Sequence, residues 1–227
     1  MQKRFSNRAE AGRELAAALG TYRGRRDVVV LALPRGGVPV GYEVARALDV
    51  PLDVFVVRKL GLPANEELAM GALASGGVRI LDDYILRVYH VSPDDVARVT
   101  IWEQAELERR EQLYRGARSF PELTGKTVIL VDDGLATGST MRAAIAALRL
   151  EHPSTIIVAV PVGAKETCDA VRELADAVVC ARTPEPFHAV GAWYDDFSQT
   201  TDDEVHDLLQ RAASERTRTT SHPQLPS

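Results

Sequence analysis

Apolar runs recur along the chain and alternate with segments of helical periodicity. The runs that predict buried strands lie at 28–33, 53–57, 128–132, 155–160 and 177–181. Apolar residues at helical spacing predict an amphipathic helix at 9–19 and further helices at 38–48, 138–150 and 165–174. Because largely apolar strands that alternate with helices favour a parallel sheet covered on both faces, we predict an α/β, doubly wound fold.

Two segments depart from this alternation. Residues 92–118 open on Ser92-Pro93-Asp94-Asp95, a favourable helix start, and continue with an apolar stripe opposite a charged face. They predict one long helical insertion, which could pack on the sheet, cap a site or form a dimer surface. A short hairpin is expected within 71–81, with its turn near Gly76 and Gly77.

The length of 227 residues is enough for one domain with a sizeable core, which we place at 1–214. Residues 215–227 are polar and contain two prolines, so they predict a disordered tail. The net charge of −5 and the absence of a basic stripe or a helix-turn-helix segment argue against a nucleic-acid partner. No apolar run approaches the ~20 residues that a membrane span needs, so no membrane partner is expected.

The cysteines and the N-terminus bear on the compartment. Cys180 lies in an apolar strand pattern and is interpreted as a core residue. Neither the number of cysteines nor the spacing of Cys168 and Cys180 suggests a zinc site or a disulfide framework. The first residues lack the apolar core of a signal peptide. We therefore expect a reducing, cytoplasmic location.

The most informative chemistry follows the strand predicted at 128–132. Two adjacent acids, Asp132 and Asp133, lead into a loop of small residues and then a helical pattern. Backbone N–H groups at such a loop, before a helix N-terminus, form a ready phosphate site. The loop lacks the Gly-Lys-Ser/Thr of a nucleotide-binding P-loop and the Gly-x-Gly-x-x-Gly of a dinucleotide site. An ordinary capped turn would explain the small residues, but paired acids at a strand's carboxyl end are less ordinary.

Residues 128–140 resemble the signature of the type I phosphoribosyltransferases, which bind phosphoribosyl pyrophosphate (PRPP). The resemblance implies that Asp132 and Asp133 hold the 2- and 3-hydroxyls of the ribose and that the loop at 136–140 wraps its 5-phosphate. The PRPP-binding residues implied in this segment are Asp132, Asp133, Gly134, Leu135, Ala136, Thr137, Gly138, Ser139 and Thr140.

The strand predicted at 28–33 runs into Pro34-Arg35-Gly36-Gly37, which resembles the pyrophosphate loop of the same family. Arg35 offers a forked donor to phosphate oxygens, and Gly36 and Gly37 permit a close backbone approach. The family often carries a cis peptide in this loop, and Pro34–Arg35 is the candidate here. A solvated surface arginine is the alternative for Arg35.

Arg58 and Lys59 follow the strand predicted at 53–57 and precede an expected flexible loop. They resemble the Arg-Lys segment that opens the mobile catalytic loop of adenine phosphoribosyltransferases. One of the two would neutralise the leaving pyrophosphate, while the other could simply extend from a strand end.

A segment at 182–200 has the general look of the family's hood, the region that covers the nucleobase. Phe187 or Trp193 could stack on a base there, and packing of the same loop onto the core is an equal alternative. Ala136 stands where hypoxanthine-guanine enzymes carry an aspartate, so the motif is closer to the adenine enzymes. Their corresponding acid comes from the mobile loop, where Glu66 and Glu67 lie in this chain, so the acceptor stays unassigned.

The resemblance implies a reaction in which a nitrogen nucleophile attacks the anomeric carbon of PRPP and pyrophosphate leaves. Asp132 and Asp133 would stabilise the positive charge on the ribose, while Arg35, Lys59 and Mg²⁺ would stabilise the leaving group. The metal would bind through ligand oxygens, with Asp132 and Asp133 as candidate protein ligands. We predict a phosphoribosyltransferase with PRPP and a small-molecule acceptor, and a homodimer by resemblance. The alternative is a PRPP-sensing regulator with little turnover.

Overall fold

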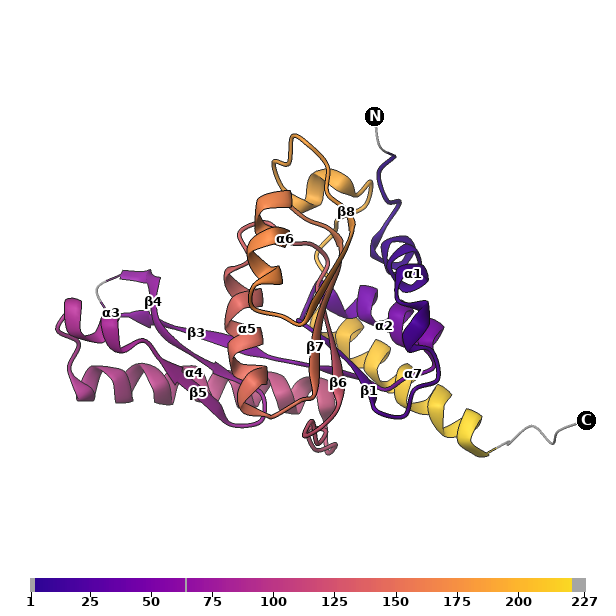
Figure 1. Ribbon diagram of the computed structural model, residues 1–227. Helices are drawn as coiled ribbons and strands as arrows, with labels where there is room; N and C mark the ends of the chain where they lie inside the picture. Colours follow the sequence, from indigo (N-terminus) through magenta and orange to yellow (C-terminus); the bar gives the residue numbers. More distant parts are fainter. Residues whose placement is uncertain (1–2, 64, 222–227) are drawn as a thin grey trace, which may run out of the picture.

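The computed structural model describes residues 3–63 and 65–221. Its centre is a five-stranded parallel sheet (Figure 1). The strands are β1 (Val28–Ala32), β2 (Leu52–Val54), β6 (Thr127–Val131), β7 (Thr155–Val162) and β8 (Ala177–Arg182). Their order is β2-β1-β6-β7-β8, and every neighbouring pair is parallel. The predicted α/β doubly wound fold is therefore confirmed, with all five strands within three residues of their expected bounds.

Helices cover both faces of this sheet (Figure 1). On one face lie α1 (Arg8–Ala18), α2 (Gly37–Leu48) and α7 (Asp202–Ser221), and on the other α5 (Ser139–Leu150) and α6 (Lys165–Arg172). Alternate residues of β1 serve the two faces, since Val28 and Val30 join one core cluster while Val29 and Leu31 join the other. Short 3-10 helices occur at Gly20–Tyr22 and Val190–Trp193.

A second, antiparallel sheet projects to one side of the main sheet, and we call it the wing (Figure 1). It contains β3 (Val57–Leu62), β4 (Asn65–Ala74) and β5 (Val78–Leu81), followed by α3 (Asp83–Val88) and α4 (Pro93–Arg115). The predicted hairpin turn at Gly76 and Gly77 is confirmed, and both residues have positive φ. The predicted long helix is also confirmed, and Ser92 caps it by accepting a hydrogen bond from Asp95 N.

Two sequence predictions about the wing were wrong. The run at 53–57 is not one strand, because β2 ends at Val54 and β3 begins at Val57. Side chains from the wing bind the intervening backbone: Arg115 Nη2 donates to Val54 O, and Ser75 Oγ accepts from Val56 N. The chain therefore leaves the parallel sheet, and the segment after Arg58 is a strand rather than a flexible loop.

The predicted disordered tail was wrong over residues 215–221, which continue α7. That helix is held by Val205 and Leu209, both fully buried against the core, and Glu215 accepts a hydrogen bond from the hydroxyl of Tyr42 at 2.9 Å. The remaining residues of the expected tail, 222–227, lie outside the described part of the chain.

Cys168 and Cys180 form a disulfide, which the number and spacing of the cysteines did not suggest. Cys168 lies on α6 and Cys180 on β8, and the chain turns back between them, so a separation of 12 residues brings the two side chains together. Within residues 3–63 and 65–221, no helix combines the length and apolar character that crossing a membrane requires.

Candidate functional site

The two candidate ligand loops lie side by side at the carboxyl ends of β1 and β6. These neighbouring strands are the first and third of the parallel sheet in chain order. The strand order therefore reverses between them, and the crevice at such a switch point is where open α/β sheets bind ligands. The sheet thus brings together Arg35, Gly36 and Gly37 after β1 with Asp132 and Asp133 after β6.

The loops approach so closely that a side chain would not fit between them. A Cβ atom built on Gly36 would stand 2.0 Å from Asp133 Oδ2. One built on Gly37 would stand 2.8 Å from Val131 O and 3.0 Å from Asp132 Cα. The Pro34–Arg35 peptide is cis, as predicted. The loop at 34–37 therefore lies directly against the acids, and glycine at positions 36 and 37 provides the space for this contact.

The carboxylates of Asp132 and Asp133 lie in surroundings that disfavour their negative charges. Asp132 is half-buried, and its Oδ1 accepts a hydrogen bond from the backbone N of Asp133 at 2.8 Å. Burial, and then the negative charge of Asp133, raises the pKa of Asp132 well above its usual range. Burial also raises the pKa of Asp133, and Arg8 opposes that rise. Such an arrangement favours a ligand that brings hydroxyl donors or positive charge to the carboxylates.

Arg8, at the start of α1, is a site residue that the sequence did not reveal. Its Nε donates to Asp133 Oδ2 at 2.9 Å, and the exposed fractions of the two side chains are 12% and 16%. Its Nη1 donates to Ser198 O at 2.7 Å, and its guanidinium lies 4.1 Å from the ring centroid of Phe197. Because 125 positions separate Arg8 from Asp133, no local motif could have joined them.

The loop after the acids ends in a left-handed turn that starts a helix. Leu135 N donates to Val162 O at 2.9 Å, which fixes the beginning of the loop on β7. Gly138 has φ of +73°, and α5 begins at the next residue. The first N–H groups of α5 have no acceptor within the helix, so the exposed residues Ser139 and Thr140 present donors at the end of the loop that follows the acids.

Arg35, the first of the predicted cations, lies near the start of α7. Arg35 is 37% exposed, and its Nη1 lies 3.8 Å from Asp202 Oδ1 at the start of α7. The same Asp202 oxygen accepts a hydrogen bond from Tyr114 at 2.6 Å. Burial, and then this hydrogen bond, raises the pKa of Tyr114 to about 12. Arg35 is therefore partly exposed to solvent, and its ion pair with Asp202 is long.

Arg58 and Lys59 lie on the wing and differ from each other. Arg58 forms an ion pair with Glu103 of α4 at 2.6 Å, whereas Lys59 is exposed. Both residues, together with Thr140, line a cavity of about 670 Å³ between the wing and α4. Glu66 also lines it, and the side chain of Glu67 lies outside the described structure. Of the two predicted cations, Lys59 is therefore the one with a side chain exposed to solvent.

The segment at 182–200, the expected hood, packs on the loop that carries Asp132 and Asp133. The residues that make this contact are not the predicted Phe187 and Trp193. Phe187 and Trp193 are half-buried against the cluster around Phe5 and Tyr194. Tyr194 is the aromatic that reaches the acids, since its hydroxyl donates to Asp133 O at 2.6 Å. Burial, and then the charge of Asp133, raises the pKa of Tyr194, so this hydroxyl stays a donor. The side chain of Val190 occupies the space that a Cβ at Gly134 would need.

Comparison with known proteins agrees with this geometry. Residues 3–194 match the model of the phosphoribosyl transferase domain. The protein Rv0571c of Mycobacterium tuberculosis (strain ATCC 25618 / H37Rv), whose name marks it as a provisional phosphoribosyl transferase, is 46% identical over 210 residues. That alignment covers 92% of this chain and 47% of the relative, so the chain spans about half the length of the curated relatives it matches most extensively. The chain belongs to the phosphoribosyltransferase family.

Two further similarities differ in extent. The crystal structure of the protein TT1426 from Thermus thermophilus is 42% identical, with a TM-score of 0.81, and the alignment covers 92% of this chain and 98% of that one. The bifunctional protein PyrR of Actinobacillus pleuropneumoniae serotype 5b (strain L20) is 46% identical over only 46 residues, or 20% of this chain and 26% of that protein. Similarity along the whole chain thus supports the fold and the family, while the acceptor is not established.

Proposed function

We propose that the protein transfers the 5-phosphoribosyl group from PRPP to a nitrogen acceptor, a nucleobase, with release of pyrophosphate. The observation that carries the proposal is the half-buried acid pair Asp132 and Asp133, set against Gly36 at the switch point of the sheet. Two carboxylates with raised pKa values suit a ligand that supplies two hydroxyls and, in the transition state, positive charge.

The remaining residues can be assigned to the other parts of PRPP. The loop at 136–140 offers backbone and hydroxyl donors to the 5-phosphate, and Gly36, Gly37 and Arg35 offer donors to the pyrophosphate. Lys59 would reach the leaving group from the wing. No protein nucleophile is required, because positioning and charge stabilisation carry the reaction.

Mg²⁺ fits this donor set as a metal held mainly by the ligand. Within the described residues, no group of three or more His, Cys, Asp or Glu side chains is arranged to hold an ion. Asp132 and Asp133 could still add carboxylate oxygens to a coordination shell completed by PRPP and water, which is how Mg²⁺ commonly binds. When bound, the metal would neutralise charge on the pyrophosphate. The homodimer and the cytoplasmic location stay predictions.

The alternative is a PRPP-sensing regulatory protein with the same fold and little or no turnover. One contact favours it: Arg58, a candidate for the leaving group, is already paired with Glu103. The exposed Lys59 beside it favours the enzyme. The two functions differ in turnover and share PRPP binding.

The test is pyrophosphate release from PRPP and Mg²⁺, scanned over purine and pyrimidine bases one at a time. Release with one base would support the transferase and name its acceptor. Binding of PRPP by calorimetry without release would favour the sensor, and the absence of binding would contradict both.

The close approach of the two loops supplies a matched pair of variants for this test. In Gly36→Ala the new methyl group would displace Asp133, so we expect PRPP binding to be lost while the circular dichroism spectrum is kept. In Gly20→Ala the methyl group has no neighbour within 4 Å, so binding should be unchanged. Equal binding by both variants would remove the proposed site.

A further inference from the structure

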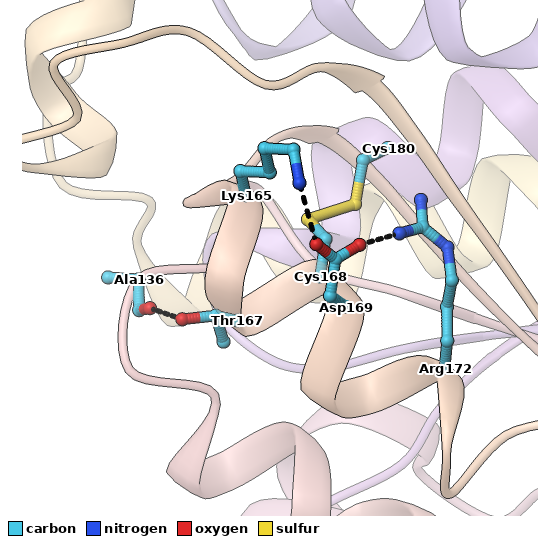
Figure 2. Close-up of a disulfide and its surroundings, with 7 residues drawn as sticks. All are labelled: Ala136, Lys165, Thr167, Cys168, Asp169, Arg172 and Cys180. Carbon is cyan, nitrogen blue, oxygen red and sulfur yellow. Dashed lines mark hydrogen bonds and ion pairs between the residues drawn. A yellow bond between two sulfur atoms is a disulfide. The ribbon is translucent and has the colours of Figure 1, made fainter.

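The first turn of α6 lies against the loop that we assign to the 5-phosphate. Thr167 Oγ1 donates a hydrogen bond to Ala136 O at 2.6 Å (Figure 2). The methyl carbon of Thr167 stands 2.8 Å from the position that a Cβ on Gly138 would take. One side chain of α6 therefore contacts the loop at two points, before and at its left-handed turn.

The sulfur of Cys168 supports the beginning of the same loop. Its Sγ lies 2.7 Å from the Cβ position of Gly163, so it packs directly on that residue's backbone. Gly163 forms a parallel bridge with Leu135, and Ala164 N donates to Leu135 O at 2.9 Å. The contacts of α6 thus extend over the loop from Leu135 to Gly138.

Helix α6 is attached to the sheet through its buried side and through the disulfide. Its buried residues are Cys168 and Val171. Asp169 pairs with Lys165 at 2.9 Å and with Arg172, so these three charged side chains pair within α6 (Figure 2). The disulfide from Cys168 to Cys180 links α6 covalently to β8 of the sheet.

The two cysteines of the disulfide differ in their exposure to solvent. Cys168 is 0% exposed, whereas Cys180 is half-buried on β8, the last strand at that edge of the sheet. A small thiolate would consequently meet the sulfur of Cys180 first.

We propose that Cys168–Cys180 is a thiol–disulfide exchange site that controls the phosphate loop, with low-molecular-weight thiols and their disulfides as its reaction partners. A thiolate attacks Cys180 Sγ, the bond between the two protein sulfurs breaks, and Cys168 leaves as a thiolate. A second thiolate then attacks the small-molecule sulfur of the mixed disulfide, which releases Cys180 as a thiolate and a small-molecule disulfide. Two electrons pass to the protein, and the reverse steps restore the disulfide.

The consequence for the site rests on the proposed function. Opening the disulfide frees α6 from β8 and weakens the contact of Thr167 with Ala136. The loop then has to be ordered when the phosphate binds, and that ordering lowers affinity. The oxidised protein should bind PRPP more tightly than the reduced protein.

The experiment measures PRPP affinity by calorimetry with Mg²⁺ on the full chain, oxidised and after treatment with excess dithiothreitol. Loss of about one hydrogen bond predicts a two- to tenfold weaker Kd in the reduced protein. Cys180→Ser should show the weaker Kd with and without thiol. Thr167→Val should weaken binding even with the disulfide intact, while Thr124→Val, at an exposed position before β6, should not.

Several outcomes would overturn the proposal. These are equal affinities in the two states, a disulfide that resists thiol in the folded protein, and a reduced protein that loses its circular dichroism spectrum. If the oxidised protein binds no PRPP, the proposed function fails, and hydrogen exchange of amides 135–140 without ligand decides this inference separately. Faster exchange on reduction would support it, and unchanged exchange would overturn it.

Discussion

Two aspartates, one on a strand of the parallel sheet and one just after another strand, have opposite electrostatic surroundings. Asp53 on β2 accepts a hydrogen bond from Arg115 Nε at 2.8 Å, and the exposed fractions of the two side chains are 10% and 4%. Arg115 also binds Val54 O and Ser75, so it joins the wing to the main sheet. Asp132, after β6, instead has another acid as its neighbour.

The difference separates a structural carboxylate from one that suits a ligand. Burial raises the pKa of Asp53, and the charge of Arg115 opposes it first. The pKa of Asp132 is raised by burial and, next, by the negative charge of Asp133. The positive charge of Arg8 lowers it only weakly. The charge of Asp53 is neutralised by an arginine of the same fold. The charges of Asp132 and Asp133 repel each other, so a bound ligand with hydroxyl donors or positive charge would stabilise them.

The largest effect is expected at the structural carboxylate. Asp53→Ala removes the more buried of the two carboxylates that pair with the guanidinium of Arg115, the other being Glu111 at 2.7 Å. It should lower the free energy of unfolding by about 3 kcal/mol, because Glu111 compensates only part of the buried charge. Urea unfolding measures it. Asp27→Ala, which breaks an exposed pair with Arg25, should leave the unfolding midpoint nearly unchanged. A small effect of Asp53→Ala on the free energy of unfolding would contradict a structural role for this carboxylate.

The acid pair should show the reverse pattern. Asp133→Asn removes a charge that would stabilise the ribose in the transition state, so kcat/KM for PRPP should fall by about 10²–10³-fold. The melting temperature should change little, because relief of the repulsion between Asp132 and Asp133 offsets the loss of the ion pair with Arg8. Steady-state kinetics beside thermal melts would measure both, and a variant that loses stability but keeps its kinetics would make Asp133 a structural residue.

Arg8 tests how far one cation tunes the acids. Arg8→Gln removes the positive charge that holds down the pKa of Asp133, so this carboxyl would protonate at higher pH. The acidic limb of the kcat/KM profile should therefore move to higher pH, with about tenfold weaker PRPP binding. Arg13→Gln is the control, because Arg13 lies on the same helix and pairs with Glu43 instead. Overlapping pH profiles for the two variants would contradict the role of Arg8.

The smallest effect concerns stability against pH. A carboxyl with a raised pKa binds protons more tightly in the folded than in the unfolded chain, so unfolding releases protons. The stability that this group contributes is therefore lost as pH rises from about 4 through its raised pKa. Asp132→Asn removes this loss and should be more stable than the natural protein near neutral pH, with the difference vanishing towards about pH 4. Thermal melts across pH would show it, and parallel stability curves would refute it.

The comparison also explains what the sequence could and could not predict. The apolar runs predicted the parallel sheet because burial on both faces demands them, and Asp132-Asp133 was visible because motif and strand are contiguous. Arg115 and Asp53 lie 62 positions apart, and Arg8 and Asp133 lie 125 apart, so their pairing depends on tertiary packing alone. The same reason hid the disulfide and the strand β3, which is held by its partners in the wing.

The absent side chain at Gly36 has a consequence for redesign of the protein. Because the carboxylate of Asp133 fills the volume that a Cβ at Gly36 would need, the two loops form one steric unit although 97 positions separate these residues. A library that varies either loop alone would mostly sample collisions. Altered sugar or phosphate specificity would have to be sought by varying both loops together, with the space between them held constant.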